Sequence, residues 1–160
     1  ALVLAQLDTY FRSAIIDENF GSVDEGDILD LQGLMSIINP DHFRARKLCI
    51  LNPAFGRAST LVGGADGDLL LDDTLIDIKT TAKTEFKRDD FNQLVGYYVL
   101  SRIGGVDDAP NQVAIENLGI YWSRFAELQI FPASEVIIAD KLPGFIDWFD
   151  KRAKEPFGSS

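Results

Sequence analysis

The chain is poor in the residues from which zinc sites, disulfides and hydrolase triads are built. It has one cysteine, Cys49, and one histidine, His42, among 160 residues. A single cysteine cannot form a disulfide within the chain, and with one histidine it cannot supply the usual ligands of a zinc site. A Ser-His-Asp triad would depend on His42, and the G-x-S-x-G motif that exposes a nucleophilic serine is absent. These absences argue against the common zinc and serine hydrolases.

The sequence also lacks long apolar runs and glycine-rich phosphate-binding motifs. No apolar stretch approaches the roughly 20 residues that cross a bilayer, so we expect no membrane span. Neither G-x-G-x-x-G nor G-x-x-x-x-G-K-[ST] occurs, which argues against a dinucleotide site or a P-loop. The single thiol and the absence of a visible secretory signal are compatible with a reducing cytoplasm, where we expect the protein to lie.

Positive charge is scarce and unevenly distributed. The formal net charge is −10, which argues against a protein that coats nucleic acid without specificity. Residues 1–41 contain eight acidic residues and one basic residue, Arg12, whereas residues 42–88 contain eight of the fifteen basic residues. Basic charge is therefore concentrated in one stretch of the chain.

The hydrophobic pattern predicts a single mixed α/β domain over residues 1–160. Helical periodicity occurs in four segments, which are residues 3–15, 28–38, 91–98 and a C-terminal segment opened by Pro143. Asp89 or Asp90 can cap the third of these helices, and Gly104-Gly105 ends it. Asp41 could cap a further short helix that ends before Pro53. Alternating patterns predict strands within residues 64–80, 113–122 and 125–131.

The most informative segment is an acidic hairpin. If Asp72-Asp73 forms its turn, three pairs of residues face each other across the strands, which are Leu71 with Thr74, Asp68 with Asp77, and Asp66 with Lys79. Strand side chains alternate with period two, so three acids and the lysine share one face. The opposite face is then an apolar core face, formed by Ala65, Leu69, Leu71, Ile76 and Ile78.

Such a face has an electrostatic cost that a cation would remove. Opposed carboxylates about 5 Å apart repel each other by about 3 kcal/mol at an effective dielectric near 20. A divalent cation such as Mg²⁺, or Mn²⁺, takes carboxylate and carbonyl oxygens as ligands. The alternative is a solvated acidic hairpin with a surface salt bridge. An EF-hand is rejected, because Leu70 and Leu71 stand where that motif needs an acid and a glycine.

At these residues the sequence resembles the PD-(D/E)xK nuclease superfamily, and within it the RecB-like nucleases. The resemblance covers residues 63–98 and rests on Gly64, Asp68-Leu69-Leu70, Leu75-Ile76-Asp77-Ile78-Lys79-Thr80-Thr81 and Gln93-Leu94-Val95-Gly96-Tyr97. Members carry an acid, a D-x-K or E-x-K tripeptide on the next strand, and a Q-x-x-x-Y signature on the following helix. The resemblance implies a restriction-endonuclease-like α-β-β-β-α-β core with a central mixed sheet flanked by helices.

The resemblance further implies metal-dependent hydrolysis of phosphodiester bonds. Asp68, Asp77 and the backbone carbonyl of Ile78 would hold one or two Mg²⁺ ions, with Asp66 as the alternative first ligand. Lys79 would orient the attacking water and offset charge in the transition state. No upstream acidic ligand stands out among four candidates, which are Glu18, Glu25, Asp30 and Asp41.

Further residues are expected to support the site or to contact nucleic acid. Gln93 and Tyr97 stand at i and i+4 and share a helix face, where they either support the site or form a hydrogen-bonded pair that packs helix on sheet. Lys83, Lys87 and Arg88 follow the second strand, where a phosphate backbone would run, and the alternative is solvated surface.

The sequence thus predicts a magnesium-dependent nuclease that acts on nucleic acid, with DNA as the expected substrate. One alternative is an inactive nuclease-fold module that binds nucleic acid or a protein. Another is an assembly subunit whose acidic N-terminal region meets a protein partner.

Overall fold

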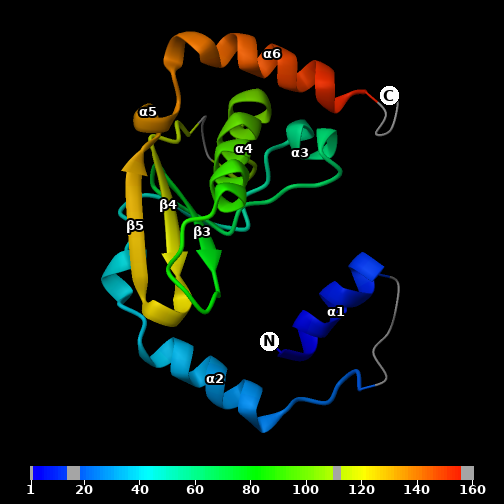
Figure 1. Ribbon diagram of the computed structural model, residues 1–160, viewed down its shortest axis with the longest axis vertical. Coiled ribbons are helices and arrows are strands. Elements are labelled where there is room, and N and C mark those ends of the chain that lie inside the picture. Colours follow the sequence, from blue (N-terminus) through cyan, green and yellow to red (C-terminus); the bar gives the residue numbers. More distant parts are fainter. Residues whose placement is uncertain (1, 14–18, 110–112, 156–160) are drawn as a thin grey trace. The chain divides into compact units, whose positions relative to one another are not determined.

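The computed structural model describes residues 2–13, 19–109 and 113–155 (Figure 1). The chain divides into two compact units, residues 1–38 and 39–160. Helices and strands both occur, and the sheet is mixed, so the chain belongs to the mixed α/β class. The expectation of a single domain stays a prediction. Across the described residues, no helix combines the length and apolar character needed to cross a membrane.

The first unit contains two helices, α1 (Leu2–Ser13) and α2 (Glu25–Ser36). Asp24 begins α2, because its side chain accepts a hydrogen bond from the backbone N–H of Gly26 at 2.6 Å. No residue of α2 is buried, and Leu29 and Met35 are among its exposed apolar side chains. Both helices were predicted, although Ala14 and Ile15 of the first prediction lie outside the described residues.

The second unit is built on a five-stranded sheet with strand order β1-β2-β3-β4-β5. The strands are β1 (Cys49–Leu51), β2 (Leu69–Leu71), β3 (Thr74–Lys79), β4 (Asn117–Trp122) and β5 (Glu127–Pro132). Only β3 and β4 are parallel within this sheet, and α4 (Arg88–Gly104) connects them as a crossover helix. The strands predicted within residues 64–80, 113–122 and 125–131 are confirmed.

The region between residues 39 and 61 differs from its prediction. No helix runs from Asp41 to Pro53. A 3₁₀ turn, η1 (Pro40–Phe43), is followed by strand β1, and a short helix, α3 (Arg57–Leu61), follows Pro53. Strand β1 pairs with β2, and the pairing uses the backbone groups that a helix would have satisfied internally.

Each face of the sheet carries a cluster of buried apolar side chains. The larger cluster joins Leu70 and Leu75 of the hairpin to Leu94 of α4. The smaller cluster, on the opposite face, contains Leu69, Leu71, Ile76 and Tyr121. The predicted core face was therefore right for Leu69, Leu71 and Ile76. It was wrong for Ala65, which packs against the larger cluster, and for Ile78, which is 38% exposed.

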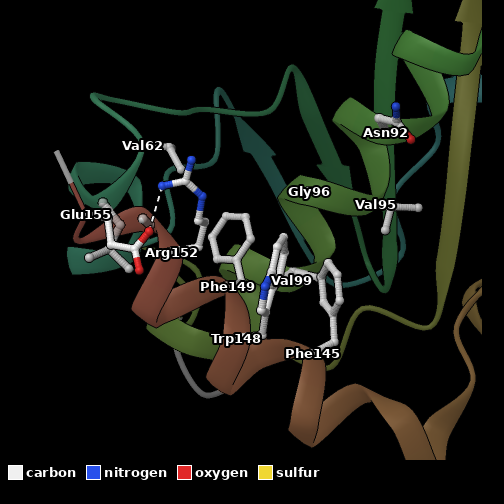
Figure 2. A pocket seen from close by; sticks show the side chains of 12 residues that line it. Val62, Asn92, Val95, Gly96, Val99, Phe145, Trp148, Phe149, Arg152 and Glu155 are labelled. Carbon is white, nitrogen blue, oxygen red and sulfur yellow. Dashed lines mark hydrogen bonds and ion pairs between the residues drawn. The ribbon is translucent and has the colours of Figure 1, made fainter. Parts of the chain in front are cut away.

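The remaining elements complete the second unit. They are η2 (Ser123–Phe125), α5 (Ala133–Val136), η3 (Ala139–Lys141) and α6 (Leu142–Ala153). The C-terminal helix opened by Pro143 is confirmed. Helix α6 presents Phe145, Trp148 and Phe149 toward α4 and lines an apolar cavity of about 480 Å³ (Figure 2).

Candidate functional site

The hairpin that carries the acidic residues has the predicted turn. Leu71 pairs with Thr74 across Asp72-Asp73. Asp72 adopts a positive φ of 54°, which a short polar side chain tolerates better than most. Its carboxylate accepts three backbone hydrogen bonds, from the N–H groups of residues 46, 47 and 48, at 2.9, 2.7 and 2.9 Å. These hydrogen bonds lower the pKa of Asp72. The tip of the hairpin is thereby fixed to the chain that leads into β1.

Asp77 is the most buried acidic group of the site. It lies in β3, is 3% exposed, and points to the side of the sheet where Leu75 and Leu94 form the larger cluster. Burial raises the pKa of its carboxyl above the ordinary value, Lys79 opposes the rise, and the charge of Asp68 adds to it. A carboxylate in this position is short of compensating positive charge.

One oxygen of Asp77 is held by the ammonium of Lys79. Its Oδ2 lies 2.8 Å from Nζ of Lys79, which makes an ion pair. The oxygen is buried, and the Lys79 ammonium is the donor that the described residues place at it. A carboxylate oxygen has more than one acceptor site, so Oδ2 could also bind a cation if the Lys79 ammonium shifted away from it.

Asp68 lies immediately before β2 and approaches β3 beside Asp77. Leu69 pairs with Ile76, and continuing that register by one residue sets Asp68 opposite Asp77, as predicted. The Asp68 Oδ2 accepts a hydrogen bond from the backbone N–H of Ile78 at 2.6 Å. Asp68 precedes Leu70 by two residues and Asp77 follows Leu75 by two, so both acids are on the side of the larger cluster.

Asp66 does not take its predicted place opposite Lys79. Strand β2 begins only at Leu69, and Asp66 forms an isolated antiparallel bridge with Ala54 instead. Gly67, whose N–H donates to the carbonyl of Pro53 at 2.9 Å, belongs to the same departure from the hairpin. Asp66 is exposed, so the structure favours Asp68 over Asp66 beside Asp77.

Lys79 stands at the end of β3 and is the cation at the centre of these acids. Its Nζ donates to Oε1 of Gln93 at 2.7 Å, contacts Oδ2 of Asp77, and lies 3.6 Å from Oδ1 of Asp90. Burial would lower its pKa, but contact with Asp77 and the charges of Asp90 and Asp68 raise it overall. The side chain is 18% exposed, so the ammonium is held in place while keeping access to solvent.

Helix α4 supplies the other half of the site. The amide of Gln93 donates to the hydroxyl of Tyr97 at 2.7 Å, which confirms that these two residues share one helix face. The Tyr97 ring stacks on Phe55 at 5.6 Å. Burial raises the pKa of the Tyr97 phenol. The carboxylates of Asp77, Asp68 and Asp66 raise it further, so all three act on this hydroxyl.

Asp90 is the residue of this site that the sequence analysis missed. It was considered only as a helix cap, but α4 begins at Arg88 with Lys87 as its N-cap. The Oδ2 of Asp90 accepts from the backbone N–H of Lys87 at 3.3 Å, while Oδ1 faces Lys79. Its spacing of three residues to Gln93 was the available signal, because such residues lie on one helix face.

The remaining predicted residues are not brought into the same cluster. Lys83, Lys87 and Arg88 are exposed and lie in the segment between Lys79 and the first turn of α4. Ile78 follows Asp77 directly, and the role of its carbonyl as a metal ligand stays a prediction.

Of the four candidates for an upstream acid, Asp41 is the one that lies in the second unit. Asp41 pairs with Arg44 at 2.8 Å, on side chains that are both well exposed. Glu25 and Asp30 belong to the first unit and Glu18 lies outside the described residues, so their roles stay predictions.

The donor set at Asp68 and Asp77 fits a hard divalent cation. Among the described residues, no three acidic, histidine or cysteine side chains are grouped closely enough to enclose a metal ion. Mg²⁺ does not need such a cage, because it commonly binds through one or two carboxylates together with water and substrate phosphates. The observation that favours this use of the pair is that the Asp77 carboxylate is buried while the charge of Asp68 acts on it.

The apolar cavity under α6 is a separate feature of α4. Asn92, Val95 and Val99 line it, and on a helix these positions lie on the face opposite Asp90, Gln93 and Tyr97. Figure 2 shows its aromatic wall and the ion pair between Arg152 and Glu155 at 2.8 Å. It has no grouped acids, so the carboxylate cluster is the better candidate for chemistry.

Comparisons with protein-family models, with curated proteins and with solved structures gave no match to this chain.

Proposed function

We propose that this protein is a magnesium-dependent nuclease that hydrolyses phosphodiester bonds, with DNA as the expected substrate. The observation that carries the proposal is the buried carboxylate of Asp77, which is 3% exposed and whose pKa is raised by burial. It lies beside Asp68 and 2.8 Å from the ammonium of Lys79. An acid pair next to a held ammonium is what metal-assisted phosphoryl chemistry requires.

Each residue has a defined role in this proposal. Asp68 and Asp77, with the carbonyl of Ile78, would hold Mg²⁺ or Mn²⁺, and the bound ion would polarise the phosphate and acidify water. Lys79 would orient the attacking water and offset the negative charge that develops on the phosphate. Gln93, itself held by Tyr97, fixes the ammonium of Lys79 through the 2.7 Å hydrogen bond. The exposed Lys83, Lys87 and Arg88 would contact the phosphate backbone.

The topology supports the proposal at the level of fold. Strands β1, β2 and β3 form an antiparallel meander. Helix α4 then crosses to β4, which is parallel to β3 (Figure 1). This order is that of the β-β-β-α-β part of the core that the resemblance implies. Helix α3 departs from the pattern, because it lies between β1 and β2.

A second candidate function is a nuclease-fold module that binds nucleic acid or a protein without cutting. It is favoured by the net charge of −10 and by the ion pair between Lys79 and Asp77, which offsets the charge of that carboxylate without a metal. A purely structural ion pair would need no metal, so metal dependence separates the two candidates.

The test is cleavage of a panel of end-labelled single- and double-stranded DNA and RNA, with Mg²⁺, with Mn²⁺ and with EDTA. We expect cleavage that depends on the metal and is lost in Asp77→Asn. Asp89→Asn is the matched control, because it removes the same charge from an exposed position in the first turn of α4. Binding of nucleic acid without cleavage under all metal conditions would favour the second candidate.

A further inference from the structure

Lys79 has two sets of partners that come from different parts of the fold. One is Asp77, two residues away on the same strand, at 2.8 Å. The other is supplied by α4, from Gln93 at 2.7 Å and Asp90 at 3.6 Å. The ammonium therefore lies between a carboxylate of the sheet and an acceptor pair of the helix.

A divalent cation at Asp77 would disturb the first set. It would take the same Oδ2 atom that faces the ammonium, and two positive groups on one carboxylate oxygen repel each other. Lys79 would then depend on the helix for its place. Gln93 is neutral and supplies a hydrogen bond only, so a negative group on the helix side is needed to balance the ammonium.

Asp90 meets this requirement. Its side chain is 20% exposed, and its Oδ2 is fixed by the backbone N–H of Lys87, which leaves Oδ1 directed toward Lys79. It stands three residues before Gln93, on the same face of α4. Because the helix N-terminus fixes it, its position does not depend on the carboxylates of the hairpin.

We propose that Asp90 is a positioning residue that retains the Lys79 ammonium on the α4 side of the site when a divalent cation takes the Asp77 carboxylate. The inference rests on the proposed metal-dependent nuclease function. Asp90 acts on the reaction through Lys79 and contacts neither the cation nor the substrate. In its absence, Lys79 stays on Asp77, where it competes with the cation and is poorly placed for water.

The test compares Asp90→Asn with the charge-matched Asp89→Asn in the 160-residue chain. Asparagine keeps an oxygen that can accept from the N–H of Lys87, so α4 is expected to start normally and the melting temperature to match that of Asp89→Asn. We expect Asp90→Asn to lower the single-turnover cleavage rate at saturating Mg²⁺ by about 10- to 100-fold. This range is typical of substitutions at residues that orient the groups in direct contact with a metal ion. Asp90→Glu should restore part of the rate, and Asp89→Asn should leave it unchanged.

Calorimetric Mg²⁺ titration supplies the second readout. In the wild-type background, Asp90→Asn should weaken Mg²⁺ binding, because Lys79 remains on Asp77. In a Lys79→Ala background, the same substitution should change the Kd by less than about twofold, since its effect passes through the missing ammonium.

The outcomes separate this inference from the proposed function. Equal weakening of Mg²⁺ binding in both backgrounds would overturn it, because Asp90 would then act on the cation directly. Cleavage by Asp90→Asn at the wild-type rate would also overturn it, while leaving the nuclease function intact. Wild-type protein that neither binds Mg²⁺ nor cleaves would overturn the proposed function and the role of Asp90 together.

Discussion

Replacement of Asp77 by asparagine tests the metal site most directly. The substitution keeps the size and shape of the side chain and removes one negative charge from a side chain that is 4% exposed. Burial of that charge raises the pKa of Asp77, so the metal-free fold should tolerate or even favour the neutral amide. A loss of Mg²⁺ affinity in this variant therefore reports on the cation and not on unfolding.

The size of the expected loss follows from Coulomb's law. A divalent cation about 4 Å from the lost charge interacts with it by about 2 kcal/mol even when screened as in bulk water, and by about 8 kcal/mol at an effective dielectric near 20. The buried side chain of Asp77 lies between these limits. The smaller value already corresponds to about a 30-fold weaker Kd, which we take as the minimum effect.

The assay is calorimetric Mg²⁺ titration, with thermal unfolding as an independent readout. At a Mg²⁺ concentration about 100 times the wild-type Kd, binding stabilises the wild type by about 2.7 kcal/mol. A variant with a 30-fold weaker site gains only about 0.9 kcal/mol under the same conditions. Asp89→Asn should behave like the wild type. Identical Mg²⁺ affinity in Asp77→Asn and the wild type would refute the assignment of a metal to Asp77.

Three other predictions concern the ammonium, the pH dependence and the packing of α4. Lys79→Ala should retain Mg²⁺ binding in calorimetry but abolish cleavage, and unchanged cleavage would contradict the role given to Lys79. Because the folded pKa of Asp77 is raised, its favourable contribution to stability is full below the ordinary value of 3.8 and is lost as pH rises through the folded pKa. In urea unfolding, the free energy of unfolding of Asp77→Asn minus that of the metal-free wild type should therefore increase as pH rises over that range. A decrease would mean that the pKa of Asp77 is lowered in the folded protein and not raised. Gly104→Ala should lower the free energy of unfolding by about 2 to 3 kcal/mol, since the added Cβ would lie 2.0 Å from the carbonyl oxygen of Phe55. Gly96→Ala, whose Cβ would have no atom within 4 Å, should stabilise α4 by about 0.5–1 kcal/mol. Equal effects of the two substitutions in urea unfolding would contradict this packing.

The parts of the site that the sequence predicted are those governed by local geometry. The turn at Asp72-Asp73 sets the pairing of Leu71 with Thr74. Counting back along both strands from that pair sets Asp68 opposite Asp77, and the alternation of strand side chains then gives the face on which Asp77 lies. The hydrogen bond between Gln93 and Tyr97 follows from their spacing on a helix. Neither inference needs any knowledge of how distant segments pack.

The parts that were missed depend on tertiary placement. Strand β1 lies in a short apolar run, Leu48 to Leu51, which periodicity alone cannot distinguish from a helix. Asp66 leaves the hairpin because its partner, Ala54, comes from a segment outside it. Asp90 faces Lys79 only because α4 crosses over the sheet between two parallel strands, and no local pattern fixes that approach.

The hairpin tip shows how one side chain can serve two demands that favour different residues. The positive φ at position 72 would suit glycine, which has no Cβ to oppose it. Glycine, however, could not accept the three N–H groups of residues 46–48 that bring the edge strand β1 into register. Aspartate is therefore a compromise between a relaxed turn and a secured sheet edge. A glycine at position 72 would relax the turn but leave those three N–H groups without their carboxylate acceptor.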